Sequence, residues 1–290
     1  MSTFNEEQIL ITGANGQLGT ALRKKYPKAQ FADITELDIT DVQSVNNYDW
    51  SKIATIINAA AFTNVDGAET PEGRKVAWKV NAQAVANLAK IAQQKDITLI
   101  HVSSDYVFDG TTIGPHTEEE NFTPLSVYGA SKAAGDLVVS TLPKYYIIRT
   151  AWVIGEGKNF VRTMLSLAEK KISPTVVSDQ IGRLTFTSEL VRAIDHLISS
   201  DYPYGTYNVT NSGPLNSWAE ITRQIFALAK VEDLVVTDIT TEKYFIGQEN
   251  IAPRPLNSDM SLQKIHATGF KSTDWQEDLE KYINNNKEDN

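Results

Sequence analysis

The sequence of 290 residues contains no cysteine, which excludes a disulfide framework and a thiolate metal site. Positive charge is also scarce, because 27 lysine and arginine residues face 36 acidic residues for a net charge of −9. An acidic surface argues against broad binding to nucleic acids or membranes. No hydrophobic run approaches the roughly 18 residues of a membrane-spanning helix, and the N-terminal segment lacks the basic flank and apolar stretch of a signal peptide. We therefore expect a cytoplasmic protein without a nucleic-acid or membrane partner.

Histidine is rare as well, with four copies that are scattered along the chain. Their spacing matches no metal-binding pattern, so we predict no metal site. His101 lies inside a predicted strand, and we expect it in the core rather than in the chemistry. Apolar residues make up 41% of the chain and charged residues 22%, which is ordinary for a globular protein of one large domain, or of one domain with a smaller lobe.

The first half of the chain alternates between two patterns. Short runs rich in β-branched residues predict buried parallel strands at Gln8–Thr12, Ala29–Ala32, Ile53–Asn58, Ile97–Ser103 and Tyr145–Thr150. Between them, helical spacing is clearest over Gly73–Gln94, where apolar residues recur every three or four positions. This alternation predicts an α/β fold with a doubly wound parallel sheet.

The second half is less regular. It predicts helices at Asn159–Lys171, Ser188–Ser199, Ser217–Lys230 and Trp275–Asn284, and short strands at Thr175–Ser178 and Thr206–Val209. The stretch Thr237–Asp259 contains Pro253 and Pro255 and is predicted to be rich in loops.

Three glycines follow the first predicted strand at intervals of three residues, Gly13, Gly16 and Gly19, and a predicted helix begins at Gln17. The first glycine permits a tight turn, the second lets the backbone approach a ligand, and the third lets helix and strand pack closely. The helix N-terminus favours negative charge, so the pattern predicts a pyrophosphate site. The spacing differs by one residue from the commoner Gly-x-Gly-x-x-Gly, and a glycine-rich turn without a ligand is the alternative.

Asp33 lies about twenty residues beyond Gly13, after the second predicted strand. An acid at this place binds the ribose 2′-hydroxyl of a dinucleotide and opposes a 2′-phosphate, which favours NAD(H). A solvated loop acid is the alternative interpretation. Asp38 is a candidate for the adenine edge.

Tyr128 and Lys132 form a Tyr-x-x-x-Lys motif on one face of a predicted helix. A nearby ammonium lowers the pKa of a phenol, so we expect Lys132 to make Tyr128 a usable proton donor at neutral pH. Alone, the motif is common by chance, and a surface pair is its usual interpretation. Ser104 ends a predicted strand, where ligands bind in such sheets, and its hydroxyl suits a substrate carbonyl. A helix cap is the alternative for Ser104.

Six segments taken together resemble one family. They are Thr12–Gly19, Asn58–Thr63, Ser104–Gly110, Arg149–Val153, Asp179–Arg183 and Arg254–Ser258. The resemblance is to the extended short-chain dehydrogenase/reductase superfamily and, within it, to the dTDP-4-dehydrorhamnose reductases, over roughly residues 8 to 280. It implies an NAD(P)-binding Rossmann fold, formed by residues 1–151 and about 184–210. It also implies a smaller substrate-binding lobe, formed by about 152–183 and 211–290.

The resemblance implies reduction of the C4 ketone of dTDP-4-dehydro-β-L-rhamnose to dTDP-β-L-rhamnose by NADPH or NADH. It places the catalytic hydroxyl at Ser104, where the family usually has threonine, the proton donor at Tyr128 and the lysine at Lys132. With the turn and Asp33 included, the expected cofactor contacts are Gly13, Asn15, Gly16, Gln17, Leu18, Gly19, Asp33, Asp38, Ile39, Ala59, Ala60, Ala61, Thr63, Ser103, Tyr128 and Lys132. The expected substrate contacts are Ser104, Asp105, Tyr106, Trp152 and Arg254.

Two of these contacts have physical alternatives. The Trp152 indole stacks on the sugar or fills the junction between the lobes, and the Arg254 guanidinium grips the diphosphate or lies exposed on a loop. Some members of the family dimerise through magnesium bound by acidic residues, but no distinctive acidic motif occurs here, so we expect a monomer or homodimer without metal. A related sugar-nucleotide epimerase or dehydratase, and a regulatory subunit like the partner of methionine adenosyltransferase, remain alternatives.

Overall fold

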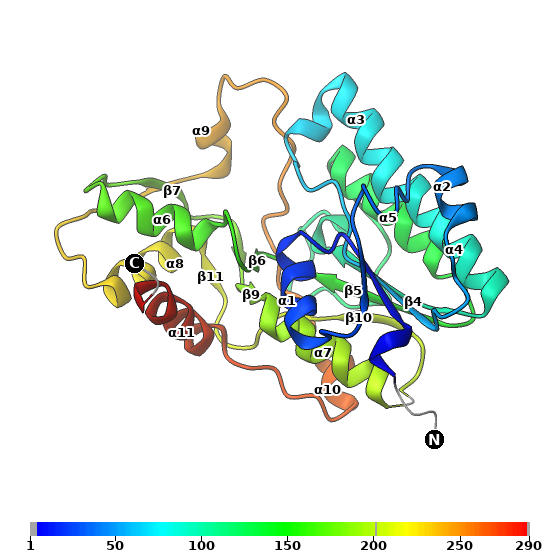
Figure 1. Ribbon diagram of the computed structural model, residues 1–290. Coiled ribbons are helices and arrows are strands. Elements are labelled where there is room, and N and C mark those ends of the chain that lie inside the picture. The colour runs from blue at the N-terminus through cyan, green and yellow to red at the C-terminus, as the bar shows by residue number, and fades with distance from the viewer. Residues whose placement is uncertain (1–4, 201, 289–290) are drawn as a thin grey trace.

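The computed structural model describes residues 5–200 and 202–288, and a six-stranded sheet lies at its centre (Figure 1). Its strands are β1 (Ile9–Thr12), β2 (Gln30–Ala32), β3 (Thr55–Asn58), β4 (Thr98–Ser104), β5 (Tyr145–Thr150) and β10 (Gly205–Asn208). All neighbours pair in parallel, in the order β10-β5-β4-β3-β1-β2. The sequence-based prediction of a doubly wound parallel sheet is therefore confirmed. Strand β2 pairs with one edge of β1, and β3 pairs with the opposite edge. The order of the strands therefore reverses between β1 and β3, which is the topological switch point of the sheet.

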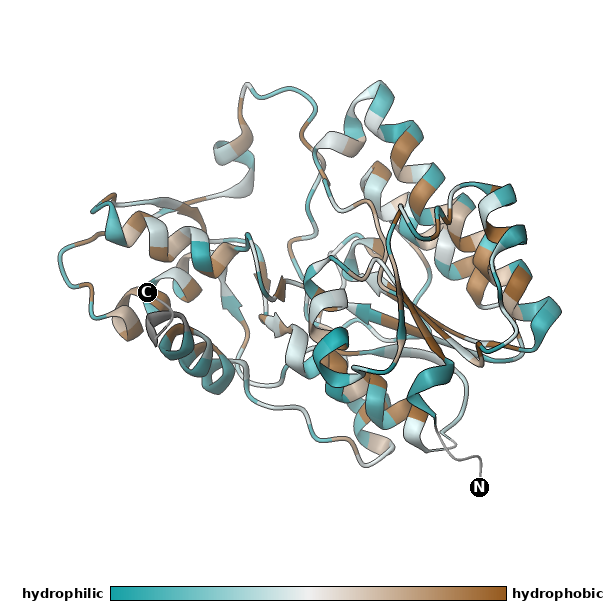
Figure 2. Cartoon of the chain, in the orientation of Figure 1, coloured by the Kyte–Doolittle hydropathy of each residue, from teal (hydrophilic) through white to brown (hydrophobic). Residues whose placement is uncertain are grey.

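Helices cover both faces of this sheet. One face carries α1 (Gln17–Lys25), α7 (Thr187–Ser199) and α10 (Gln263–Ala267). The other carries α2 (Val42–Asn47), α4 (Ala84–Lys95) and α5 (Val127–Val139). Hydrophobic residues run along the central strands, while the flanking helices alternate between hydrophobic and hydrophilic bands (Figure 2). This is the pattern that a parallel sheet buried on both faces requires.

The long helix expected over Gly73–Gln94 is present but interrupted. It consists of α3 (Pro71–Trp78), a π-helical turn (Lys79–Gln83) and α4. Asn81 lies in the π turn and is fully buried. Its side chain accepts a hydrogen bond from the Phe62 amide at 2.9 Å and donates to the Phe62 carbonyl at 3.1 Å and to Ser131 at 3.0 Å. The wide turn thus ties the loop after β3 to helix α5, which the apolar spacing alone does not reveal.

The second lobe contains α6 (Phe160–Glu169), α8 (Trp218–Ala229) and α11 (Trp275–Glu288), which pack around the fully buried Trp275. Three two-stranded sheets accompany them: β7 (Thr175–Val177) with β12 (Thr237–Ile239), β8 (Ile181–Gly182) with β11 (Asn216–Ser217), and β6 (Val153–Ile154) with β9 (Thr185–Phe186). The short 3-10 helices are Glu6–Gln8, Gly67–Glu69 and Asp105–Val107. Within the described residues, no helix combines the length and apolar character needed to cross a membrane.

One expectation for this half was confirmed with added detail, and one was wrong at a helix end. The stretch Thr237–Asp259 is rich in loops as expected, and it also contains β12 and the helix α9 (Thr241–Phe245). Strand β12 is stabilised by pairing with β7, which local sequence does not show, and Thr240 caps α9 by accepting from the Lys243 amide. Helix α11 runs to Glu288 rather than ending at Asn284.

Candidate active site

The glycine turn brings the ends of β1 and β3 into backbone contact. Gly13 has φ of +66°, and a Cβ there would lie 2.5 Å from the Ala60 nitrogen. A Cβ on Gly19 would lie 2.2 Å from the Gly13 carbonyl oxygen. Gly16 is the N-cap of α1 and no side chain caps this helix end. The first turn of α1 therefore presents backbone amides at the switch point of the sheet, where an anionic group binds.

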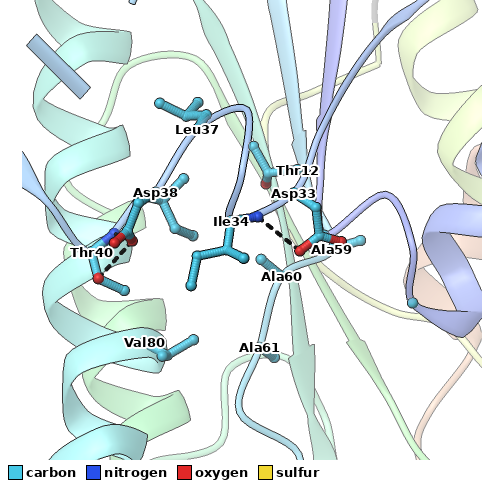
Figure 3. Close-up of a pocket in the computed structure, with 13 residues that line it drawn as sticks. Thr12, Asp33, Ile34, Leu37, Asp38, Thr40, Ala59, Ala60, Ala61 and Val80 are labelled. Atoms are coloured by element: carbon cyan, nitrogen blue, oxygen red, sulfur yellow. Dashed lines mark hydrogen bonds between the residues drawn. The ribbon is translucent and has the colours of Figure 1, made fainter. Parts of the chain in front are cut away.

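A cavity of about 310 Å³ opens beside this turn (Figure 3). Its lining comes from the turn, from the loop after β2, from the loop after β3 and from the π turn: Thr12, Gly13, Gly16, Asp33, Ile34, Leu37, Asp38, Ile39, Thr40, Ala59, Ala60, Ala61 and Val80. Small side chains on the β3 loop and two carboxylates on the β2 loop give it an apolar floor with polar acceptors at its edge. This combination suits a nucleoside.

The two carboxylates are held by local hydrogen bonds. Asp33 accepts from the Ile34 amide at 2.9 Å and from the Asn15 amide at 3.2 Å. Asp38 accepts from the Thr40 hydroxyl at 2.6 Å and from its amide at 2.9 Å. The Thr40 hydroxyl is the largest cause that holds the pKa of Asp38 below its ordinary value. Asp38 is therefore an ionised acceptor at neutral pH, and the hydrogen bonds hold both side chains in fixed orientations.

Eight of the expected cofactor contacts line this cavity: Gly13, Gly16, Asp33, Asp38, Ile39, Ala59, Ala60 and Ala61. Others lie elsewhere. Leu18 packs into the core below α1, and the Asn15 side chain accepts from Arg23 at 3.2 Å. Gln17 lines a separate hollow with Thr187, and Thr63 is exposed outside the cavity.

Five lining residues were missed by sequence reasoning: Thr12, Ile34, Leu37, Thr40 and Val80. Ile34 illustrates the reason: it is 69% exposed beside Asp33, and this exposure is visible only in the structure.

The expected catalytic residues Ser104 and Tyr128 lie at the carboxyl end of β4 and at the start of α5. Ser104 is the last residue of β4, and Tyr128 lies in the first turn of α5, whose N-cap Ser126 accepts from the Gly129 amide at 3.0 Å. Burial raises the pKa of Tyr128 to about 12, and the nearby Ser104 hydroxyl acts in the opposite direction. Tyr106 stands edge-on to Tyr128, with ring centres 5.4 Å apart. The phenol is therefore protonated at neutral pH and is a proton donor rather than a base.

Lys132 lies deeper than its spacing from Tyr128 suggested. It is 2% exposed, donates to the Val102 carbonyl at 2.7 Å and lies 3.4 Å from His101 Nε2. Burial lowers its pKa from 10.5 to about 8, and Asp136 acts in the opposite direction. The expectation that this ammonium lowers the pKa of the phenol was wrong, since the pKa of Tyr128 is raised.

Asp105 is closed to direct contact with a substrate. It is 2% exposed, accepts from Ser104 at 2.9 Å with one oxygen and from Ser258 at 2.6 Å with the other. Burial raises its pKa. The carboxyl group therefore orients the Ser104 hydroxyl, a role that local sequence could not show because Ser258 is 153 residues away.

Trp152 and Arg254 are both held at the junction between the lobes. Trp152 has φ of +50° and stacks on Trp218 with ring centres 3.7 Å apart. Arg254 donates to both oxygens of Asp66 at 2.7 Å, while its buried Nη1 has no hydrogen-bond partner. Arg254 is thus not an exposed loop residue, because it is paired with Asp66. Sequence reasoning missed Asp66 because 188 positions separate the two residues.

The parallel sheet with a glycine turn at its switch point, and the Ser104, Tyr128 and Lys132 set at the strand ends, define an oxidoreductase of the short-chain dehydrogenase/reductase class. Comparison with known proteins narrows the class. The model of the family described as "RmlD substrate binding domain" matches residues 7–288, so the chain belongs to this family.

Named relatives and solved structures agree with this assignment. A dTDP-4-dehydrorhamnose reductase of Aggregatibacter actinomycetemcomitans is 39% identical, over 94% of this chain and 97% of the relative. A crystal structure of a dTDP-4-dehydrorhamnose reductase from Clostridium acetobutylicum is 38% identical with a TM-score of 0.88, over 95% and 98% of the two chains. A dTDP-4-dehydrorhamnose reductase from Bacillus anthracis, crystallised in complex with NADP, is 35% identical with a TM-score of 0.87 over the same shares.

Proposed function

We propose that this protein reduces the C4 ketone of dTDP-4-dehydro-β-L-rhamnose to dTDP-β-L-rhamnose with NADPH or NADH. The observation that carries the proposal is the placement of Ser104 at the carboxyl end of β4 and of Tyr128 in the first turn of α5, beside a dinucleotide-type turn. The names of the relatives support the dTDP-sugar substrate, and the NADP of the Bacillus anthracis structure supports the cofactor.

The residues of the turn and its cavity fit such a cofactor. Gly13 and Gly19 leave room that any Cβ would fill, the uncapped start of α1 suits a pyrophosphate, and the cavity beside Asp33 and Asp38 suits the adenosine half. When bound, the cofactor supplies the hydride that reaches C4 of the sugar.

The chain itself binds the ketone and supplies the proton. Tyr128 donates to the ketone oxygen, and Ser104 lies at the adjoining strand end. Because the Ser104 hydroxyl donates to Asp105 in this structure, it binds the ketone by turning from Asp105 to that oxygen. Because the pKa of Tyr128 is about 12, the phenol carries its proton at neutral pH and delivers it to the oxygen as hydride reaches the carbon. The Lys132 amine donates to the Val102 carbonyl, which holds it beneath this site.

We also propose that the two lobes bind different ligands. Residues 1–151 and about 184–210 bind the dinucleotide, and about 152–183 and 211–290 bind the sugar nucleotide, with α10 returning to pack on the sheet. The reaction needs a hydride and a proton but no metal ion, and we propose a monomer or homodimer that works in the cytoplasm, where its cofactor and sugar nucleotides occur, without nucleic acid.

The direct test follows oxidation of NADPH and of NADH with dTDP-4-dehydrorhamnose, set against the GDP- and UDP-linked analogues. We expect oxidation with the dTDP-linked sugar at a kcat/KM at least about tenfold above the others. Cofactor binding without oxidation of the cofactor by any sugar nucleotide would contradict the proposal and favour a regulatory subunit.

Gly13→Ala should weaken NADPH binding. The change forces a side chain into the left-handed region and against the Ala60 backbone, so the dissociation constant should rise about 10- to 100-fold. Gly269→Ala is the matched control, because Gly269 has φ of +88° with open space around it. Isothermal titration of both variants checks this, and equal affinities would show that the turn does not hold the pyrophosphate.

Asp33→Ala should improve the use of NADPH relative to NADH by about tenfold, because it removes a negative charge beside the ribose and a 2′-hydroxyl acceptor. The kcat/KM ratio for the two cofactors is the measurement. Asp49→Ala removes the same charge from an exposed site outside the cavity and should leave the ratio unchanged. An unchanged ratio in Asp33→Ala would mean that Asp33 does not contact the ribose.

A further inference from the structure

A buried chain of polar side chains runs beneath the sheet ends from the cofactor cavity to Lys132. The Thr12 hydroxyl donates to Asn58 Oδ1 at 2.8 Å, Asn58 Nδ2 lies 3.1 Å from His101 Nδ1, and His101 Nε2 lies 3.4 Å from Lys132 Nζ. All four residues are at most 2% exposed. The chain crosses β1, β3 and β4 and ends on α5. Groups so deeply buried need partners, but partners alone do not explain why a histidine is used.

The position of the proton on His101 follows from the backbone. The Ala60 amide approaches Asn58 Oδ1 at 3.2 Å, and because an amide N–H can only donate, this oxygen must face Ala60. The Asn58 amide nitrogen therefore faces the ring and donates to His101 Nδ1. Burial, aided by Lys132, lowers the pKa of His101 well below 6.5, so the ring is neutral. A neutral ring that accepts at Nδ1 carries its proton on Nε2.

This proton faces Lys132. A ring N–H cannot accept a hydrogen bond from an ammonium, but it can donate to a neutral amine, so it favours the uncharged form of Lys132. Asp136 on α5 favours the charged form; its Oδ1 lies 3.9 Å from His101 Nε2, beyond hydrogen-bond distance, and Arg149 on β5 donates to its Oδ2 at 2.9 Å. The other ionisable groups that face this region are Tyr128, protonated at neutral pH, and Asp105 behind Ser104.

We propose that His101, held by Asn58 with its proton on Nε2, is a positioning residue that sets the balance between charged and neutral Lys132 in the reduction. The effect of His101 on the reduction rests on the proposed function, whereas the hydrogen bonds among Asn58, His101 and Lys132 do not. It also connects the loop that lines the cofactor cavity to the catalytic lysine, because Ala60 fixes the orientation of Asn58.

Asn58→Asp should change which ring nitrogen of His101 carries the proton. A carboxylate can only accept, so the ring proton moves to Nδ1, and Nε2 becomes an acceptor for the Lys132 ammonium. In the unchanged protein the ¹³Cε shift of Lys132 should follow the loss of its proton near pH 8. In Asn58→Asp this titration should move up by one pH unit or more.

The double variant Asn58→Asp/His101→Phe, compared with His101→Phe, separates this route from a direct effect of the new charge. If the ring transmits the effect, Asn58→Asp should shift the Lys132 titration by less than a third of a unit in the phenylalanine background. A full shift in that background, or no shift in Asn58→Asp, would overturn the proposal.

Two measurements need neither turnover nor a stable variant at Asn58. Long-range ¹H–¹⁵N correlation spectra of the histidine rings should contain one neutral ring, protonated on Nε2, that does not titrate between about pH 5 and 8. The ¹³Cε shift of Lys132 reports its titration directly. A ring protonated on Nδ1, or four titrating rings, would contradict the proposal even in a protein that reduces its substrate, whereas absence of turnover with the expected ring would contradict only the proposed function.

Discussion

Tyr128→Phe should lower kcat by about 10²- to 10⁴-fold and leave the dissociation constant of NADPH nearly unchanged. The variant loses one oxygen atom, which is the proton donor in the reduction, and keeps the ring that packs edge-on against Tyr106. Because the pKa of Tyr128 is about 12, its protonation state does not limit the rate at neutral pH, so the loss should be equal from pH 6 to 8. Steady-state kinetics with a separate titration of the cofactor measures both quantities.

The matched control is Tyr26→Phe. Tyr26 is also buried in the sheet-bearing lobe, and its hydroxyl binds Asp195 at 2.9 Å, away from the site. This variant should keep the turnover of the unchanged protein within about threefold while losing some stability. Normal turnover in Tyr128→Phe would remove Tyr128 from the mechanism.

Lys132→Met should lower both the rate and the affinity for the cofactor, and it should also raise the stability of the folded protein. Burial lowers the pKa of Lys132 from 10.5 to about 8, which corresponds to a cost of roughly 3 kcal/mol for keeping the charge inside the fold. Methionine fills a similar volume without a charge. The free energy of unfolding at pH 7 should therefore rise by as much as about 3 kcal/mol, less the contribution of the hydrogen bond to Val102.

The pH dependence of the free energy of unfolding tests whether the buried charge of Lys132 destabilises the fold. A base whose folded pKa is depressed destabilises the fold fully below pH 8, and the penalty disappears as pH rises toward 10.5. The difference in stability between Lys132→Met and the unchanged protein should therefore shrink over this range, as measured by denaturant unfolding. If Lys132→Met were much less stable at pH 7, the lysine would be a structural residue.

The parallel sheet was predictable because its strands are short, buried on both faces and rich in β-branched residues, as in Ile9–Thr12 and Tyr145–Thr150. The glycine turn was predictable for a similar reason, since Gly13 and Gly19 have no room for a Cβ and local spacing records that requirement. Both features depend on residues that are close together in the chain.

Features that depend on distant residues were not predictable. Arg254 meets Asp66 across 188 positions, and Asp105 meets Ser258 across 153. Helical spacing places Lys132 on the same face as Tyr128 but says nothing about depth, and the depth of Lys132 decides the direction of its pKa. His101 was expected only in the core, where it does lie. The hydrogen bond that orients it comes from Asn58 on β3, which itself accepts from Thr12 on β1.

Transfer of deuterium from C4-deuterated NADPH to the sugar tests the central claim most directly. With dTDP-4-dehydrorhamnose the product should be dTDP-rhamnose with deuterium bound to C4 of the sugar, seen by NMR, and Tyr128→Phe should give almost none in the same time. A product without deuterium, or inversion at another carbon without net oxidation of the cofactor, would contradict the account and indicate an epimerase instead.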